Sequence, residues 1–185
     1  MKKIALVAIA AATMAFAGGD IATVETPVTV EKTGIYAGVA YTYGDVGIAT
    51  NEWFDGEIGT ANAVSFAVGY NVIPNLAVEA RYSYITEDAF AAFPVEVDGS
   101  VWSVFAKPQY GFDNGVVVYG LLGLGQVELN DVYTETTFQY GAGLAYNIDA
   151  DYLVFADYTR LADDADFAGI GINVDALNVG VAYKF

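Results

Sequence analysis

The sequence contains no cysteine and no histidine, and it is poor in positive charge. The absence of cysteine excludes disulfides and thiolate metal sites, and the absence of histidine excludes a histidine base or a catalytic triad built on one. Seven lysines and arginines stand against 23 aspartates and glutamates, for a formal net charge of −16. We therefore expect no nucleic-acid partner, because phosphate contacts need clustered Lys and Arg.

Long hydrophobic runs are also missing. The apolar stretch at residues 4–16 is shorter than the about 20 residues that a membrane-spanning helix needs. It follows the basic start Met1-Lys2-Lys3 and ends at a small-x-small site, Ala15-Phe16-Ala17. We interpret residues 1–17 as a secretory signal peptide that is cleaved after about Ala17. Residues 18–33 show no clear periodicity, which predicts a flexible leader.

Hydrophobic residues make up 55% of the chain and are interleaved with small and polar ones. An alternation with a period of two indicates β-strands with two unlike faces. The pattern recurs in eight segments, at residues 34–43, 62–71, 76–84, 100–110, 116–125, 137–147, 152–160 and 177–185. The facing of the fifth segment is ambiguous, and we favour Val118, Leu122 and Leu124 on its outer face.

The connections between these segments alternate in length. The short ones lie at residues 71–75, 111–115 and 147–151, and the second of them contains Asn114-Gly115, a strong tight-hairpin signal. The long ones lie at residues 44–61, 85–99, 126–136 and 161–175. An internal repeat supports the strand register, since residues 65–84 align without gaps on residues 141–160, an offset of 76. One hairpin unit therefore recurs along the chain.

Three segments and the signal peptide carry a resemblance to a known class of proteins. The segments are Gly34-Ile35-Tyr36-Ala37-Gly38-Val39, Gly141-Ala142-Gly143-Leu144-Ala145-Tyr146 and the terminal Tyr183-Lys184-Phe185. With them the chain resembles the OmpA-like and opacity-protein class of small outer-membrane barrels of Gram-negative bacteria, a porin-like class.

The resemblance implies an all-β fold, a single eight-stranded antiparallel up-and-down transmembrane β-barrel over residues 34–185. The long loops would face outward, and the short turns and both termini would face the periplasm. Expected partners are outer-membrane lipid, lipopolysaccharide and the barrel assembly machinery. That machinery would recognise the terminal strand by its apolar face, which consists of Leu177, Val179, Val181, Tyr183 and Phe185.

Tyrosines fall near the ends of the predicted strands, where amphipathic rings would form girdles at the two membrane interfaces. The predicted outer girdle contains Tyr41, Tyr43, Tyr82, Tyr84 and Tyr158, and the inner girdle contains Tyr70, Tyr110, Tyr146 and Tyr152. The alternative is the tyrosine enrichment of any β protein.

Four ionisable residues alternate onto the inner faces of the predicted strands, namely Glu79, Arg81, Lys107 and Asp157. An eight-stranded barrel is just wide enough for side chains to fill it. Charges buried there should pair, because isolated ones carry a large desolvation cost. We predict one network, with Lys107 reaching Glu79 and Asp157 reaching Arg81. Its function would be a static plug or, as the alternative, a switchable gate.

The long connections hold 15 acidic residues and no Lys or Arg. These are Asp45, Glu52, Asp55, Glu57, Glu87, Asp88, Glu96, Asp98, Glu128, Asp131, Glu135, Asp163, Asp164, Asp166 and Asp175. They would serve as a solvated surface or contact an extracellular ligand. Divalent cations prefer such oxygen ligands, but Asp163-Asp164-Ala165-Asp166 lacks the full EF-hand pattern. We expect no metal site and no cofactor.

The leading hypothesis is a non-enzymatic structural or surface-interaction barrel without an open pore. The alternatives are a small passive channel and an adhesin that acts through its loops. Outer-membrane barrels that are enzymes depend on histidine. This chain has none, so we expect no enzymatic activity.

Overall fold

The computed structural model describes residues 34–48, 56–90, 99–129, 133–167 and 170–185. The predicted signal peptide and leader lie outside these residues. So do five of the 15 acidic residues, namely Glu52, Asp55, Glu96, Asp98 and Asp131.

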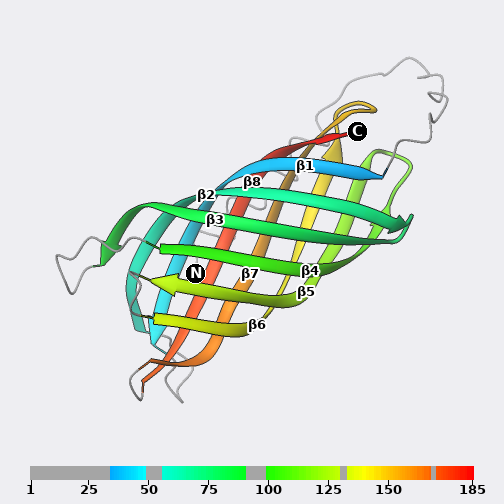
Figure 1. Cartoon of the computed structure of the whole chain (residues 1–185). Coiled ribbons are helices and arrows are strands. Elements are labelled where there is room, and N and C mark those ends of the chain that lie inside the picture. Colours follow the sequence, from blue (N-terminus) through cyan, green and yellow to red (C-terminus); the bar gives the residue numbers. More distant parts are fainter. Residues whose placement is uncertain (1–33, 49–55, 91–98, 130–132, 168–169) are drawn as a thin grey trace. The chain divides into compact units, whose positions relative to one another are not determined.

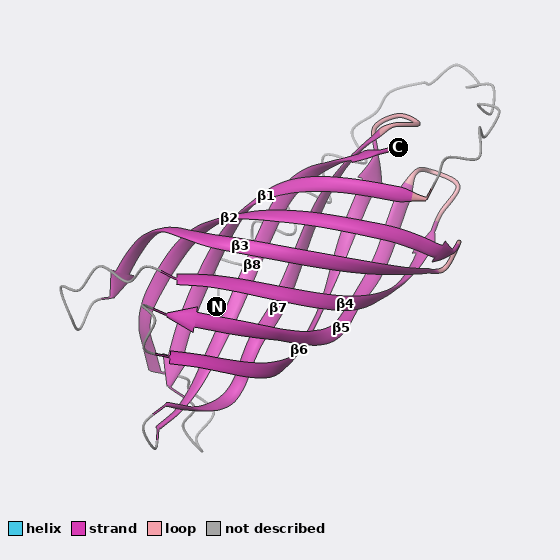
Figure 2. Cartoon of the chain, viewed as in Figure 1, coloured by secondary structure: helices cyan, strands magenta, loops and turns pink. Residues whose placement is uncertain are grey.

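The described residues form a closed antiparallel barrel of eight strands (Figures 1 and 2). Each strand pairs with the next one in the chain, and β1 pairs with β8 to close the sheet. The strands are β1 (Ile35–Ile48), β2 (Gly56–Ile73), β3 (Leu76–Phe90), β4 (Gly99–Gly111), β5 (Val116–Leu129), β6 (Tyr133–Asn147), β7 (Tyr152–Phe167) and β8 (Ile170–Lys184). The predicted all-β, eight-stranded architecture is confirmed.

The predicted strand ends were wrong on the side of the long connections. Strand β7 continues past residue 160 to Phe167, and β8 begins at Ile170 instead of at residue 177. The predicted connections at 44–61, 85–99, 126–136 and 161–175 are therefore partly strand. Backbone pairing explains this result, because the ladder needs only amide and carbonyl groups and continues where the apolar alternation has faded.

The three short connections are tight turns, and they lie at the same end of the barrel as the C-terminus (Figure 1). In the β4–β5 turn, Gly115 has a φ of 84°, and the Asn114 side chain accepts a hydrogen bond from the Val116 amide at 3.2 Å. In the β6–β7 turn, the Asp149 carboxylate accepts from the amides of Asp151 and Tyr152, both at 2.7 Å. Local side-chain bonds thus fix where these two hairpins reverse.

The two faces of the sheet differ sharply. Large apolar side chains such as Phe66, Val104 and Leu144 are exposed on the outside, whereas Phe105 and Leu121 are buried inside. Strand β5 resolves its ambiguity in the same way. Leu122 and Leu124 are exposed on its outer face, as the sequence favoured, whereas Val118 is half-buried. Its inner face carries Tyr119 and Leu121. Within the described part of the chain, no helix has the length and hydrophobicity that a membrane crossing requires.

Candidate functional site

The four predicted lumenal residues lie inside the barrel. Glu79 and Arg81 come from β3, Lys107 from β4 and Asp157 from β7. Their exposed fractions are 1%, 8%, 8% and 2%, respectively. Strand alternation produces this placement, since residues two apart share a face. The flanking residues Ala80 and Tyr82 point the other way, and Tyr82 is exposed on the outer surface.

The Arg81 guanidinium is the centre of the site. Its Nε donates to Glu79 Oε1 at 2.6 Å. Its two terminal nitrogens donate to the two carboxylate oxygens of Asp157, both at 2.8 Å. Such a bidentate, charge-assisted pair is among the strongest side-chain contacts. Because β3 and β7 are not neighbours in the sheet, the guanidinium spans the lumen.

Lys107 and two tyrosines complete the network. The Lys107 ammonium donates to Glu79 Oε2 at 2.7 Å and lies 4.0 Å from the centroid of the Tyr119 ring. The Tyr36 hydroxyl also donates to Glu79 Oε2, and the Tyr119 hydroxyl donates to Asp157 Oδ2 at 2.8 Å. Two cations therefore balance two carboxylates, and phenol groups satisfy the lone pairs that the cations leave.

A neutral polar layer lies next to the charges. Asn178 donates to Asp157 Oδ1 at 2.8 Å and accepts from the Thr42 hydroxyl at 2.6 Å. Hydrogen bonds then run from Thr42 to Ser65 and from Ser65 to Ser83, across β1, β2 and β3. The ion network is thus anchored to a chain of hydroxyl groups that crosses the inner wall.

Sequence reasoning missed Tyr36, Tyr119 and Asn178 as members of the site. By alternation, Tyr36 and Asn178 fall on the strand face opposite to the one that carries the large apolar residues, but the sequence pattern gives no partner for either side chain. Tyr119 lies in the glycine-rich strand whose facing was ambiguous. One available signal was that a buried carboxylate accepts several hydrogen bonds, and inward-facing tyrosine hydroxyl and asparagine amide groups are donors that can supply them.

Glycines make room for this packing. A Cβ added at Gly143 would lie 2.5 Å from the Cβ of Asp157 and 2.6 Å from the Tyr119 ring. A Cβ added at Gly69 would meet the Tyr36 ring at 2.0 Å. Each large lumenal side chain therefore lies over the glycine that is paired with it on the neighbouring strand, Tyr119 over Gly143 and Tyr36 over Gly69.

The predicted girdle tyrosines all point away from the lumen. Their exposed fractions run from 36% at Tyr43 to 58% at Tyr110. The others are Tyr41, Tyr70, Tyr82, Tyr84, Tyr146, Tyr152 and Tyr158. The terminal strand likewise exposes Val179, Val181, Tyr183 and Phe185 on the outside, and Leu177 is half-buried.

Arg160 of β7 is held in place by two acidic side chains. It forms a two-fold pair with Asp175 of β8, at 2.9 and 3.0 Å, and a further contact to Asp163 at 3.0 Å. Its side chain is 20% exposed and that of Asp163 is 50% exposed. The ion pairs of Arg160 with Asp163 and Asp175 are therefore better solvated than the pair of Arg81 with Asp157.

The lumenal network offers little scope for chemistry. Glu79 accepts from three donor groups, on Arg81, Lys107 and Tyr36. Asp157 accepts from four, on Arg81, Tyr119, Asn178 and Thr159. Among the described residues, no three Asp, Glu, His or Cys side chains gather closely enough to hold a metal ion. The arrangement is suited to joining strands across the lumen.

Comparisons with known proteins place this geometry in context. A family model described as an outer membrane protein β-barrel domain matches residues 4–185. A search of curated proteins found no match.

The matches to solved structures of the same fold extend over nearly the whole length of those structures. Ail of Yersinia pestis, in complex with the heparin analogue sucrose octasulfate, is 20% identical over 82% of this chain and 97% of its own, with a TM-score of 0.56. Neisserial surface protein A is 15% identical over 82% and 97%, with a TM-score of 0.61. The N-terminal barrel domain of Pseudomonas aeruginosa OprF is 16% identical over 84% and 100%, with a TM-score of 0.56. Identities this low show a shared fold alone.

Replacing Arg81 by alanine should destabilise the barrel by about 3–5 kcal/mol, because two buried carboxylates lose a shared partner. Arg160→Ala should cost only about 1 kcal/mol, because its partners are partly solvated. Urea unfolding of the protein in liposomes measures both. Equal, small losses in the two variants would mean that the lumenal network contributes no stability.

The glycine packing makes a second prediction. Gly143→Ala should destabilise by about 1–3 kcal/mol, because the new methyl group overlaps Asp157 and Tyr119. The matched control is Gly120→Ala, whose Cβ would have its nearest neighbour at 3.6 Å and should change stability by no more than about 0.5 kcal/mol. The same unfolding assay applies, and a neutral Gly143→Ala variant would contradict the tight packing.

Proposed function

The chain belongs to the family of outer membrane protein β-barrel domains, and on this premise we propose that it is a non-enzymatic barrel of the bacterial outer membrane that does not conduct. Its role is structural or one of surface interaction. Side chains fill its lumen, and its long connections meet the medium outside the cell.

The observation that supports this proposal most strongly is the Arg81 guanidinium. It is bonded to Glu79 on its own strand and to Asp157 across the lumen, with all three side chains buried. A narrow barrel with such a crossing contact leaves no continuous path for water or ions at that level. The static plug is therefore preferred to the switchable gate.

The outer surface supports a membrane location. Apolar and aromatic side chains cover it, among them Val68, Leu124 and Phe138. An open sheet edge has unpaired backbone groups, which the hydrocarbon of a membrane would not tolerate. The pairing of β1 with β8 leaves no such edge along the paired residues. The inner face is polar where the outer face is apolar, as in lumen-filled outer-membrane barrels.

We infer an orientation from the connection lengths. The turn-bearing end, with the C-terminus, faces the periplasm, and the long connections face outward. The outer surface of the barrel then contacts lipid toward the periplasmic end and lipopolysaccharide toward the extracellular end. The assembly machinery would recognise the terminal strand through its exposed side chains, from Val179 to Phe185.

An adhesin function through the loops is the second candidate. The relative Ail is described with a heparin analogue, which is a polyanion. In this chain residues 44–61, 85–99, 126–136 and 161–175, which contain the long connections and the strand ends beside them, carry 15 acids and no Lys or Arg. Like charges repel, so a ligand of that kind does not fit here, and any loop partner would be neutral or cationic.

Planar-bilayer recording tests the proposal. The wild-type protein and the Arg160→Ala variant should show no steady open events above those of heat-denatured protein. Arg81→Ala should show openings, because it removes the side chain that crosses the lumen. Steady conductance of the wild type would instead support the channel alternative.

Orientation is tested by labelling. The chain has no native cysteine, so single cysteines can be placed at Asn114, in a short turn, and at Thr134, near the far end of β6. An impermeant maleimide on intact cells should label Thr134→Cys and spare Asn114→Cys, while lysed cells should label both. The reverse result on intact cells would invert the barrel.

A further inference from the structure

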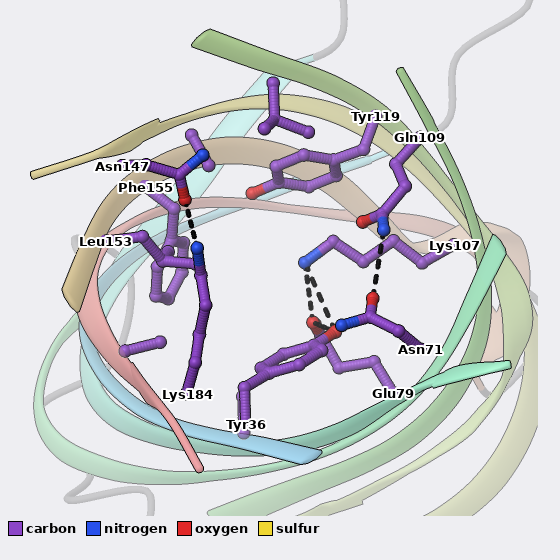
Figure 3. Close-up of a pocket in the computed structure, with 14 residues that line it drawn as sticks. Tyr36, Asn71, Glu79, Lys107, Gln109, Tyr119, Asn147, Leu153, Phe155 and Lys184 are labelled. Atoms are coloured by element: carbon purple, nitrogen blue, oxygen red, sulfur yellow. Dashed lines mark hydrogen bonds and ion pairs between the residues drawn. The ribbon is translucent and has the colours of Figure 1, made fainter. Parts of the chain in front are cut away.

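The two ends of the barrel differ in how their polar side chains are satisfied. Figure 3 shows the lumenal cavity at the turn-bearing end, where Lys107 bonds to Glu79 and Lys184 bonds to Asn147. At the opposite end, the Oε2 atom of Glu135 on β6 is buried and has no hydrogen-bond partner. No other side-chain oxygen or nitrogen of the described residues is in this state. A buried acceptor without a donor is destabilising, so this position favours an added donor.

The β-ladder between β6 and β7 stops short of Glu135. β6 pairs with β5 as far as Tyr133, but its pairing with β7 ends at Tyr140, opposite Arg160. Beyond Arg160, β7 shifts register twice against β8 and continues in that pairing alone. Irregularities of this kind bend a strand, and here they begin where β7 leaves β6. Residues 133–139 therefore have one edge without a ladder partner among the described strands.

A side-chain contact closes the inner part of this gap. The Thr137 hydroxyl donates to the Leu161 carbonyl oxygen at 2.5 Å, in place of a backbone bond. The open edge is thus residues 133–136, whose outward side chains Thr134 and Thr136 are polar and exposed. Further along the same face of β6 the exposed side chains are apolar or aromatic. The open edge therefore lies beyond the apolar surface, where dissolved molecules can reach it.

The outer part of this chain has no cation for Glu135. The four outer spans contain no Lys or Arg, and Arg160 is already held by Asp163 and Asp175. Glu135 is paired on β5 with Val127, which is buried on the inner face. Residues that face each other across two strands share a face, so a residue opposite Glu135 on an added strand would also point inward. A cationic side chain at that position would meet the carboxylate.

We propose that an extended, basic peptide segment of another protein adds to the β6 edge as a further strand and places a Lys or Arg side chain against Glu135. The edge offers alternating amide and carbonyl groups, which an extended chain can pair with and a free cation cannot. Glu135 then determines the charge and the register of the bound segment.

This inference rests on the surface-interaction role proposed above and specifies its partner. The two can fail separately. Steady conductance of the wild type would refute the closed lumen and leave the open edge in place. Absent peptide binding by a barrel that does not conduct would refute the edge site alone.

The probe is the peptide trifluoroacetyl-Thr-Val-Lys-Val-Thr-amide, followed by ¹⁹F NMR during titration with the folded protein in zwitterionic micelles. Empty micelles give the background, and gel mobility before and after boiling verifies folding. We expect saturable binding. The same peptide with norleucine in place of lysine should bind at least about fivefold more weakly, because it cannot form the charge-assisted bond.

Backbone pairing is tested with two further peptides. One is N-methylated at both valines, and the other is N-methylated at the lysine and both threonines. Each lacks the amide donors of one strand edge, so at least one of them should bind at least about fivefold more weakly than the unmodified peptide.

Two variants locate the charge. Glu135→Gln keeps the size of the side chain and should reduce the affinity for the lysine peptide to that for the norleucine peptide. Glu128→Gln removes an equal charge from the neighbouring strand β5 and should leave the preference for lysine unchanged. The proposal is overturned by absent saturation, by equal affinity of the wild type for the two peptides, by a lysine preference that survives Glu135→Gln, or by unchanged binding of both N-methylated peptides. It is also overturned by a dimer of the folded protein that excess peptide fails to dissociate, which would assign the edge to a second copy.

Discussion

A buried guanidinium must find compensating charge, and much of the barrel interior is organised around this requirement at Arg81. The carboxylates of Glu79 and Asp157 pair with it, which leaves one excess negative charge. Lys107 neutralises that charge through its ion pair with Glu79. Tyr36, Tyr119 and Asn178 then satisfy the remaining carboxylate oxygens. Removing any one member would leave a desolvated charge or lone pair, so the network stabilises the fold only as a complete set.

Geometry imposes a second constraint, which is the narrowness of an eight-stranded barrel. Large inward side chains are accommodated because a glycine stands beside them on the neighbouring strand, as Gly143 does for Tyr119 and Gly69 does for Tyr36. The same alternation that brings the charges inward turns the tyrosines and branched apolar residues outward. One period-two pattern thus produces both the closed lumen and a surface compatible with lipid.

Much of this followed from the sequence, for physical reasons. Alternation predicted the strands and placed the Arg81 and Asp157 side chains on the inner face. These two residues are 76 positions apart, and this separation equals the offset of the internal repeat. Equivalent positions of two similar hairpins thus face each other across the lumen. Tyr119 could not be assigned, because it stands between three valines and the run Gly-Leu-Leu-Gly-Leu-Gly, and neither side shows a polar face. The far ends of β7 and β8 were missed because backbone pairing continues there after the apolar alternation has stopped.

The central claim is that Arg81 and Asp157 stabilise the barrel through each other, and a double-mutant cycle tests it most directly. Arg81→Met, Asp157→Asn and the double variant are unfolded by urea in liposomes, with Arg160→Met and Asp175→Asn as the matched solvated pair. We predict a coupling of at least about 1.5 kcal/mol for the lumenal pair and a smaller one for the control. Single losses that add to within about 0.5 kcal/mol would contradict the account.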